Sequence, residues 1–98
     1  MDYKLYWTDE SLQNLDEILE YLTYYWTQKE IDHFKQKLGR MLDLIIKNPF
    51  LFPISKYNKR LRKAVLSKQT TIFYEVKENT IYLVYLFVNR KNISRIKK

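Results

Sequence analysis

A chain of 98 residues in which 46% are hydrophobic, one is glycine and two are proline has the composition of a single globular domain, not of a disordered chain. It has no cysteine, which excludes disulfides, thiol chemistry and thiolate metal sites. Its net charge is +7, and no apolar run reaches the roughly 18–20 residues of a membrane span. The N-terminus also lacks a signal-peptide layout, so we expect a cytoplasmic protein that does not contact membranes.

The N-terminal quarter of the chain predicts a short strand followed by a helix. Residues 3–7 are rich in aromatic side chains in an alternating pattern, which favours a strand. Thr8 follows as an N-cap, with Asp9 and Glu10 where the helix dipole favours negative charge. Apolar residues then recur every three or four positions and predict a helix of about 18 residues. Its expected core stripe is Leu12, Leu15, Leu19, Leu22 and Trp26.

A second helix should begin almost at once. Thr27 and Glu30 fit a capping box, and Pro49 disfavours helical backbone at the residue before it, so the helix should end near Lys47. Its apolar stripe is Ile31, Phe34, Leu38, Leu42 and Ile45, with Met41 and Ile46 beside it. Because almost no loop separates the helices, they should form an antiparallel hairpin. The loop at 49–59 should be anchored to the core by Phe50, Leu51 and Phe52.

Three strands are predicted in the second half of the chain. They are rich in β-branched and aromatic residues and cover residues 62–66, 70–76 and 80–88. The short polar links between them require antiparallel pairing, and Asn79 suits the left-handed backbone of a tight hairpin. The last strand is apolar on both faces, which places it inside the sheet. The sequence therefore predicts an α+β fold, an antiparallel β-sheet with an N-terminal α-helical hairpin packed on one face, in the order β-α-α-β-β-β.

Charge is distributed unevenly along this single domain of residues 1–98. Residues 1–49 hold nine acidic and six basic side chains, a net charge of −3, whereas residues 50–98 hold two acidic and twelve basic side chains, a net charge of +10. The excess includes a basic C-terminal tail at 89–98. Such a field attracts phosphate backbones or an acidic protein partner.

The usual signatures of catalytic and cofactor chemistry are missing. His33 is the only histidine and lies mid-helix, where a surface role is favoured over metal ligation. The only glycine, Gly39, lies in the same helix, so no glycine loop can cradle a phosphate. Ser67 and Ser94 have no histidine near them in sequence. We expect neither a metal nor a cofactor.

Cationic chemistry remains. Arginine offers a fixed fork of donors that matches phosphate, and Arg62 and Arg90 flank the strand region so that both could reach one side of the sheet. Further basic residues expected to bind nucleic acid or a target are Lys56, Lys59, Arg60, Lys63, Lys91 and Arg95. Tyrosines that could stack on bases are Tyr57, Tyr74, Tyr82 and Tyr85. Tyr74 and Tyr85 equally fit core positions with a bonded hydroxyl.

Several segments together resemble the RelE/ParE superfamily of bacterial toxins. They are the Trp-Thr-Asp-Glu helix start at 7–10, the Leu-x-x-Leu-x-x-Ile stripe, the Asn-Pro stop, the Arg-Leu-Arg-Lys strand, the Ile-Phe-Tyr-Glu-Val strand and the closing Asn-Arg. The resemblance covers the whole chain. It implies the toxin of a type II toxin–antitoxin module, bound in a hetero-oligomer by a cognate antitoxin with an acidic, poorly folded segment.

The resemblance implies two mechanisms. RelE-like members cleave mRNA on the ribosome without metal, and ParE-like members block DNA gyrase without a catalytic residue. By position, Arg62 and Arg90 match the family's arginines, and Lys56 and Lys59 lie near its lysine-bearing loop. After Tyr85 the chain has no Tyr, His or Glu for proton transfer, and isoleucines stand in the tail instead.

Whether the chain is an enzyme therefore stays open. The missing proton-transfer residue and the long hairpin favour the gyrase-directed branch. A metal-independent endoribonuclease that holds phosphate with Arg62 and Arg90 is the alternative, and a plain nucleic-acid-binding module is a third.

Overall fold

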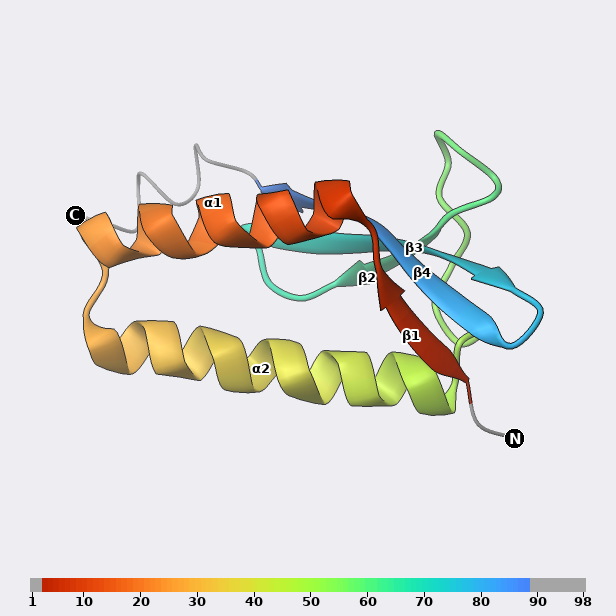
Figure 1. Cartoon of the computed structure of the whole chain (residues 1–98), viewed down its shortest axis with the longest axis horizontal. Coiled ribbons are helices and arrows are strands. Elements are labelled where there is room, and N and C mark those ends of the chain that lie inside the picture. The colour runs from red at the N-terminus through yellow and green to blue at the C-terminus, as the bar shows by residue number, and fades with distance from the viewer. Residues whose placement is uncertain (1–2, 89–98) are drawn as a thin grey trace.

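A four-stranded sheet in the order β1-β4-β3-β2 forms the centre of the computed structural model, which describes residues 3–88 (Figure 1). The elements are β1 (Lys4–Trp7), α1 (Asp9–Tyr25), α2 (Gln28–Lys47), β2 (Arg62–Val65), β3 (Thr70–Lys77) and β4 (Thr80–Val88). No helix within this part of the chain combines the length and apolarity that crossing a bilayer requires. The predicted element order is confirmed.

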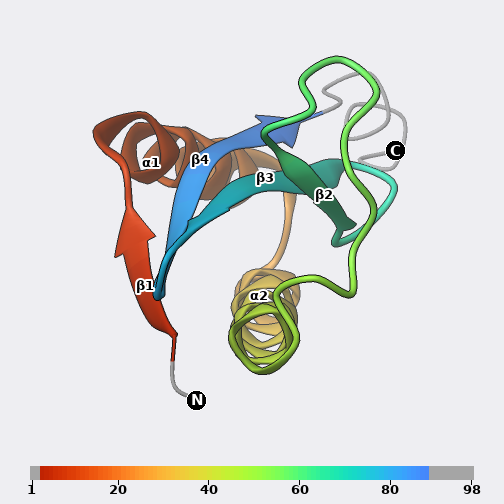
Figure 2. The ribbon, with the colours of Figure 1, turned by 90° about the vertical axis from the view of Figure 1, so that its right-hand side faces the viewer.

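The meander β2-β3-β4 is antiparallel and β4 lies inside the sheet, both as predicted. The sheet as a whole is mixed, because β1 pairs with β4 in parallel, from Lys4 opposite Thr80 to Trp7 opposite Leu83. Strands so far apart in sequence leave no local signal of their pairing. The N-terminal strand thereby becomes one edge of the sheet and β2 the other (Figure 2).

The start of α1 is fastened to β4. The Thr8 hydroxyl accepts from the Ser11 backbone N–H at 3.2 Å and donates to the backbone carbonyls of Leu83 at 2.8 Å and Val84 at 2.9 Å. One turn later the Asn14 side-chain oxygen accepts from the Leu86 backbone N–H at 3.0 Å. The helix thus continues along the edge of β4 beyond the end of β1.

This attachment sets which face of α1 is buried. Ser11, Ile18 and Leu22 are buried, whereas Leu12, predicted to be in the core, is 46% exposed. The buried face is therefore centred one residue earlier than the leucine stripe indicated. Thr8 and Asn14 turn their side of the helix toward the strand edge, which leaves Leu12 at the exposed margin of the buried face.

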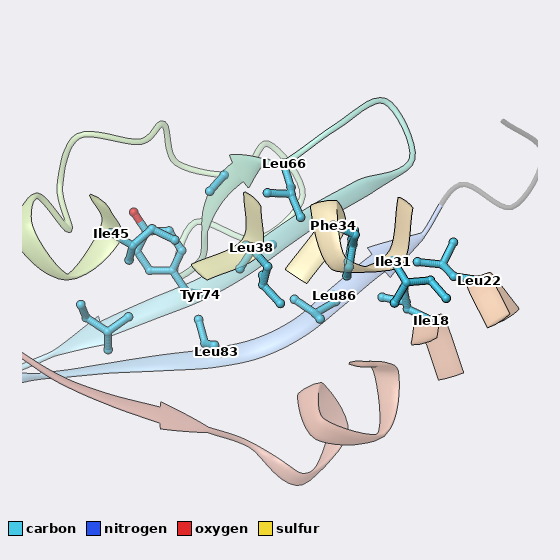
Figure 3. Close-up of a cluster of buried hydrophobic side chains, with 13 residues drawn as sticks. Ile18, Leu22, Ile31, Phe34, Leu38, Ile45, Leu66, Tyr74, Leu83 and Leu86 are labelled. Carbon is cyan, nitrogen blue, oxygen red and sulfur yellow. The ribbon is translucent and has the colours of Figure 1, made fainter. Parts of the chain in front are cut away.

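The second helix matches its prediction closely. The capping box of Thr27 and Glu30 is present, and the helix ends at Lys47. The helix lies beneath the concave side of the curved sheet (Figure 2). Its buried residues are Ile31, Phe34, Leu38 and Ile45, which join side chains of β2, β3 and β4 in one core cluster (Figure 3). The helical hairpin and the sheet thus share a single core.

Two local expectations were wrong. In the two-residue turn between β3 and β4, Glu78 takes the left-handed conformation with φ of 53°, and Asn79 does not. A turn with positive φ only at its first position has the pattern of type II′, so the strained residue precedes Asn79. In the loop after α2, Phe52 packs against the core, but Phe50 is 59% and Leu51 63% exposed.

Candidate functional site

The sheet surface turned away from α2 is the open face. Side chains alternate along each strand, so the neighbours of the core residues point to it. Its members are Lys4, Tyr6, Lys63, Val65, Thr71, Phe73, Glu75, Lys77, Thr80, Tyr82, Tyr85 and Phe87. Aromatic and basic side chains dominate it, and Glu75 is its only acidic member.

A β-bulge maintains this face on β4. The register between β3 and β4 shifts between Phe73 and Tyr74, so that Phe73 pairs with Tyr85 and Tyr74 pairs with Leu83. Leu83 and Leu86 can then both enter the core although they are three residues apart. The rings of Phe73 and Tyr85 stack on the open face with centroids 4.7 Å apart.

A pocket of about 280 Å³ opens where this face meets the loop before β2. Lys56 and Tyr57 approach it from the loop, and Lys63, Phe73 and Phe87 approach it from three strands. Two ammonium groups thus stand beside an aromatic floor, and none of the lining residues within 3–88 carries a carboxylate. Such a site suits a phosphate next to a flat ring, or an acidic side chain next to an apolar one.

Backbone hydrogen bonds fix the loop that carries Lys56. Ser55 is buried, its backbone N–H donates to the Leu61 carbonyl at 2.8 Å and its hydroxyl accepts from the Tyr57 N–H at 3.2 Å. The Asn58 side-chain oxygen accepts from the Arg60 N–H at 3.0 Å, which closes a tight turn. Of the predicted basic residues, Lys56 and Lys63 meet in the pocket.

Lys59 and Arg60 are exposed on that turn and do not line the pocket. Arg90, Lys91 and Arg95 lie outside the described residues.

Arg62 points to the opposite face from Lys63. Its Nη1 donates to the Phe52 carbonyl at 2.7 Å and to the Phe50 carbonyl at 3.3 Å, and its guanidinium lies 5.0 Å from the centre of the Phe50 ring. The structure therefore does not bring Arg62 to the pocket lined by Lys56 and Lys63, which we call the lysine pocket. Arg62 instead holds the loop between α2 and β2.

Tyr74, predicted to contact nucleic acid, takes its alternative role in the core. It is fully buried, and its hydroxyl donates to the Pro49 carbonyl at 2.7 Å. Burial raises the pKa of Tyr74 to about 12, against the opposing influence of the Arg62 charge. A side chain so enclosed cannot stack on a base in this conformation.

Phe73 and Phe87 were not predicted as site residues, because their aromatic side chains indicated only that these positions belong to strands. The alternation of side chains along a strand could have identified them. Each is adjacent to a core residue, so its side chain points to the opposite face of the sheet. Tyr57, a predicted stacking candidate, is 95% exposed at the mouth of the pocket.

Neither family models nor curated proteins show a match to this sequence. Among solved structures, a chain of the chromosomal ParDE TA system from P. aeruginosa has a TM-score of 0.73 and 16% identity, covering 88% of this chain and 95% of that chain. A chain of the E. coli DinJ-YafQ toxin-antitoxin complex has a TM-score of 0.64 and 10% identity, with coverages of 93% and 97%.

The YoeB/ParE toxin from Agrobacterium tumefaciens has a TM-score of 0.62 and 15% identity, covering 88% of this chain and 98% of that one. All three matches extend over nearly the full length of both chains. The chain therefore has the fold of RelE/ParE-like toxins, as its resemblance to them predicted.

Proposed function

We propose that this chain is the toxin of a type II toxin–antitoxin module and that a cognate antitoxin neutralises it in a hetero-oligomer in the cytoplasm. The observation that carries the proposal is the full-length fold match to a chain of a ParDE system, with a TM-score of 0.73. The match to a chain of the DinJ-YafQ complex supports an antitoxin partner in the same way.

The open face supplies the surface for target binding. Its pocket combines Lys56, Lys63 and Tyr57 without a lining carboxylate, so its field favours an anionic or acidic partner. The exposed Phe87 and Val65 on the same face add apolar area. Basic and apolar groups side by side suit a protein target or a nucleic acid.

Between the two branches of the fold, we favour a toxin that blocks gyrase by binding. A ribonuclease of this type needs an arginine beside the scissile phosphate, and Arg62 is bonded to two loop carbonyls on the other face of its strand. Within residues 3–88 no histidine or carboxylate lines the lysine pocket, and its three hydroxyls belong to Ser55, Thr71 and Tyr57. A toxin that blocks gyrase by binding alone needs neither an arginine at a phosphate nor a proton-transfer residue.

A ribosome-dependent endoribonuclease is the second candidate. It is favoured by the placement of Lys56 and Lys63 in one pocket beside Tyr57, because two ammonium groups and a ring suit a nucleotide. In this reading the lysines stabilise the cleaved phosphate and Arg90 supplies the arginine.

The test is tightly controlled expression in bacteria, with DNA and protein synthesis followed separately by pulse labelling during the first minutes. We expect DNA synthesis to stop first. We also expect growth to be restored by co-expression of the adjoining gene, which under this proposal encodes the antitoxin. Protein synthesis stopping first would favour the endoribonuclease. Continued growth would contradict the toxin assignment and leave a plain nucleic-acid-binding module.

Substitutions on the open face sharpen the test. The double variant Lys56→Ala, Lys63→Ala should lose growth arrest, whereas the matched control Lys35→Ala, Lys47→Ala changes two exposed lysines of α2 and should retain it. Equal toxicity of the two variants would remove the lysine pocket from the proposal.

A further inference from the structure

A second cavity, of about 360 Å³, runs along the flank of α2 and away from the open face. Side chains from the helical hairpin line one side of it, and the β2–β3 connection, with Ser67 and Gln69, lines the other. The helical residues that line it include Trp26, His33, Phe34, Lys37 and Arg40. Most of them recur at spacings of seven, four and three, which places them on one stripe of the helix flank.

The rim of this groove is cationic and unpaired. Among residues 3–88 no carboxylate forms a salt bridge with Lys37 or Arg40. Glu30, the one acidic lining residue, directs its Oε1 to the Thr27 backbone N–H at 2.9 Å in the capping box. The groove therefore offers two positive charges that no carboxylate of the described residues pairs directly, beside the single carboxylate of Glu30 held in the capping box.

Trp26, which lines the groove, carries an unsatisfied donor. Nε1 of Trp26 is buried, and no acceptor within residues 3–88 bonds to it. An indole N–H can only donate, and a buried donor without an acceptor costs about 1–3 kcal/mol. An acceptor supplied by a partner removes that cost once the indole ring turns its N–H edge into the groove.

We propose that the groove along α2 binds an acidic amphipathic segment of the antitoxin. This inference rests on the proposed function and names a docking site for its partner. An apolar side chain of the segment packs on Trp26 and Phe34, and carboxylates pair with Lys37 and Arg40. Charge complementarity selects an anionic partner. The apolar floor favours an acidic polypeptide over a nucleic acid, because it rewards a packed apolar side chain.

The position of the groove has a consequence for neutralisation. Helix α2 lies beneath the concave side of the sheet (Figure 2). The groove that its residues line and the open face are therefore on different sides of the molecule. An antitoxin anchored on α2 can stay bound while the lysine pocket is covered or uncovered. Docking and inhibition are therefore separable by mutation.

The experiment measures the dissociation constant of the full chain for the protein encoded by the adjoining gene. The variant Lys37→Glu, Arg40→Glu should bind at least tenfold more weakly yet still arrest growth. The matched control Lys29→Glu, Lys35→Glu reverses two exposed charges of the same helix outside the groove and should bind within twofold of the unaltered chain.

The indole N–H resonance of Trp26 gives an independent readout, assigned by comparison with Trp7→Phe in ¹⁵N-labelled protein. We expect it to shift when the partner binds, and Trp26→Phe to weaken binding. A complex that tolerates Lys37→Glu, Arg40→Glu and leaves this resonance unmoved would overturn the docking site while the toxin proposal stands. Failure of the unaltered chain to bind at all would overturn the proposed function itself.

Discussion

Two adjacent residues, Arg62 and Lys63, have opposite roles because strand side chains alternate. Lys63 reaches the pocket on the open face, and Arg62 donates to the carbonyls of Phe50 and Phe52 on the other. A cluster of basic residues in the sequence therefore divides into one group that can meet a partner and one that stabilises a loop. Charge alone does not distinguish the two.

Tyr74 gives a prediction at the residue scale. Its pKa of about 12 in the folded protein exceeds the value of about 10 expected in the unfolded chain. The folded state thus holds this proton more tightly, so the resulting stability is fully present below pH 10 and is lost as pH rises toward 12.

We expect Tyr74→Phe to lower the free energy of unfolding at pH 8 by about 1–2 kcal/mol, because the buried Pro49 carbonyl loses its donor. At pH 11 the difference from the unaltered protein should narrow by roughly 1 kcal/mol. Urea unfolding at both pH values measures it, with Tyr57→Phe as an exposed control. A difference independent of pH would contradict the shifted pKa.

At the scale of elements, the two helix caps differ in what they join. Thr27 closes an exposed capping box within the hairpin, whereas Thr8 caps α1 and also donates to carbonyls of β4, 75 residues away in the case of Leu83. Thr8 thus connects a helix start to the bulged part of a strand. This connection also decides which side of α1 is buried.

We expect Thr27→Ala to lower the free energy of unfolding by about 1 kcal/mol, the usual value of a helix cap. Thr8→Ala should cost about 2–3 kcal/mol, because the Val84 carbonyl also loses the Thr8 hydroxyl as donor and the Leu83 carbonyl keeps only the Thr8 backbone N–H. Chemical denaturation of both variants measures the difference. Thr23→Ala is the control, since that exposed hydroxyl bonds only within its own helix and should change stability by less than about 0.5 kcal/mol. Equal costs for Thr8 and Thr27 would contradict the role of the strand contact.

At the scale of the whole molecule, charge and surface are divided. Helix α1 carries five acidic side chains and no basic one, while the pocket on the open face is lined by two lysines and no carboxylate. A field divided in this way attracts and orients an anionic partner before contact. Attraction of this kind acts on the rate of association and weakens as salt screens it.

We expect the association rate constant with the proposed acidic antitoxin to fall at least about tenfold between 50 and 500 mM salt, with a much smaller change in the dissociation rate constant. Stopped-flow fluorescence of the two tryptophans measures both. An association rate insensitive to salt would mean that the charge separation does not steer the partner.

Much of this protein follows from its sequence. The capping box at Thr27, the end of α2 near Lys47 and the three strands of the meander all depend on neighbours a few residues apart, so local patterns predicted them. Lys56 and Lys63 were each named from the sequence as basic residues that could bind a target, but their meeting in one pocket was not predicted. The fold class and the resemblance to RelE/ParE toxins rested on these same local patterns.

Only the tertiary structure decided the rest. The parallel pairing of β1 with β4, the burial of Ile18 in place of Leu12, and the enclosure of Tyr74 each depend on contacts between segments far apart in sequence. The unpaired rim of Lys37 and Arg40 likewise became a groove only when the β2–β3 connection was placed beside α2. Periodicity shows that a side chain is apolar or charged on one face of an element, but packing decides what that face meets.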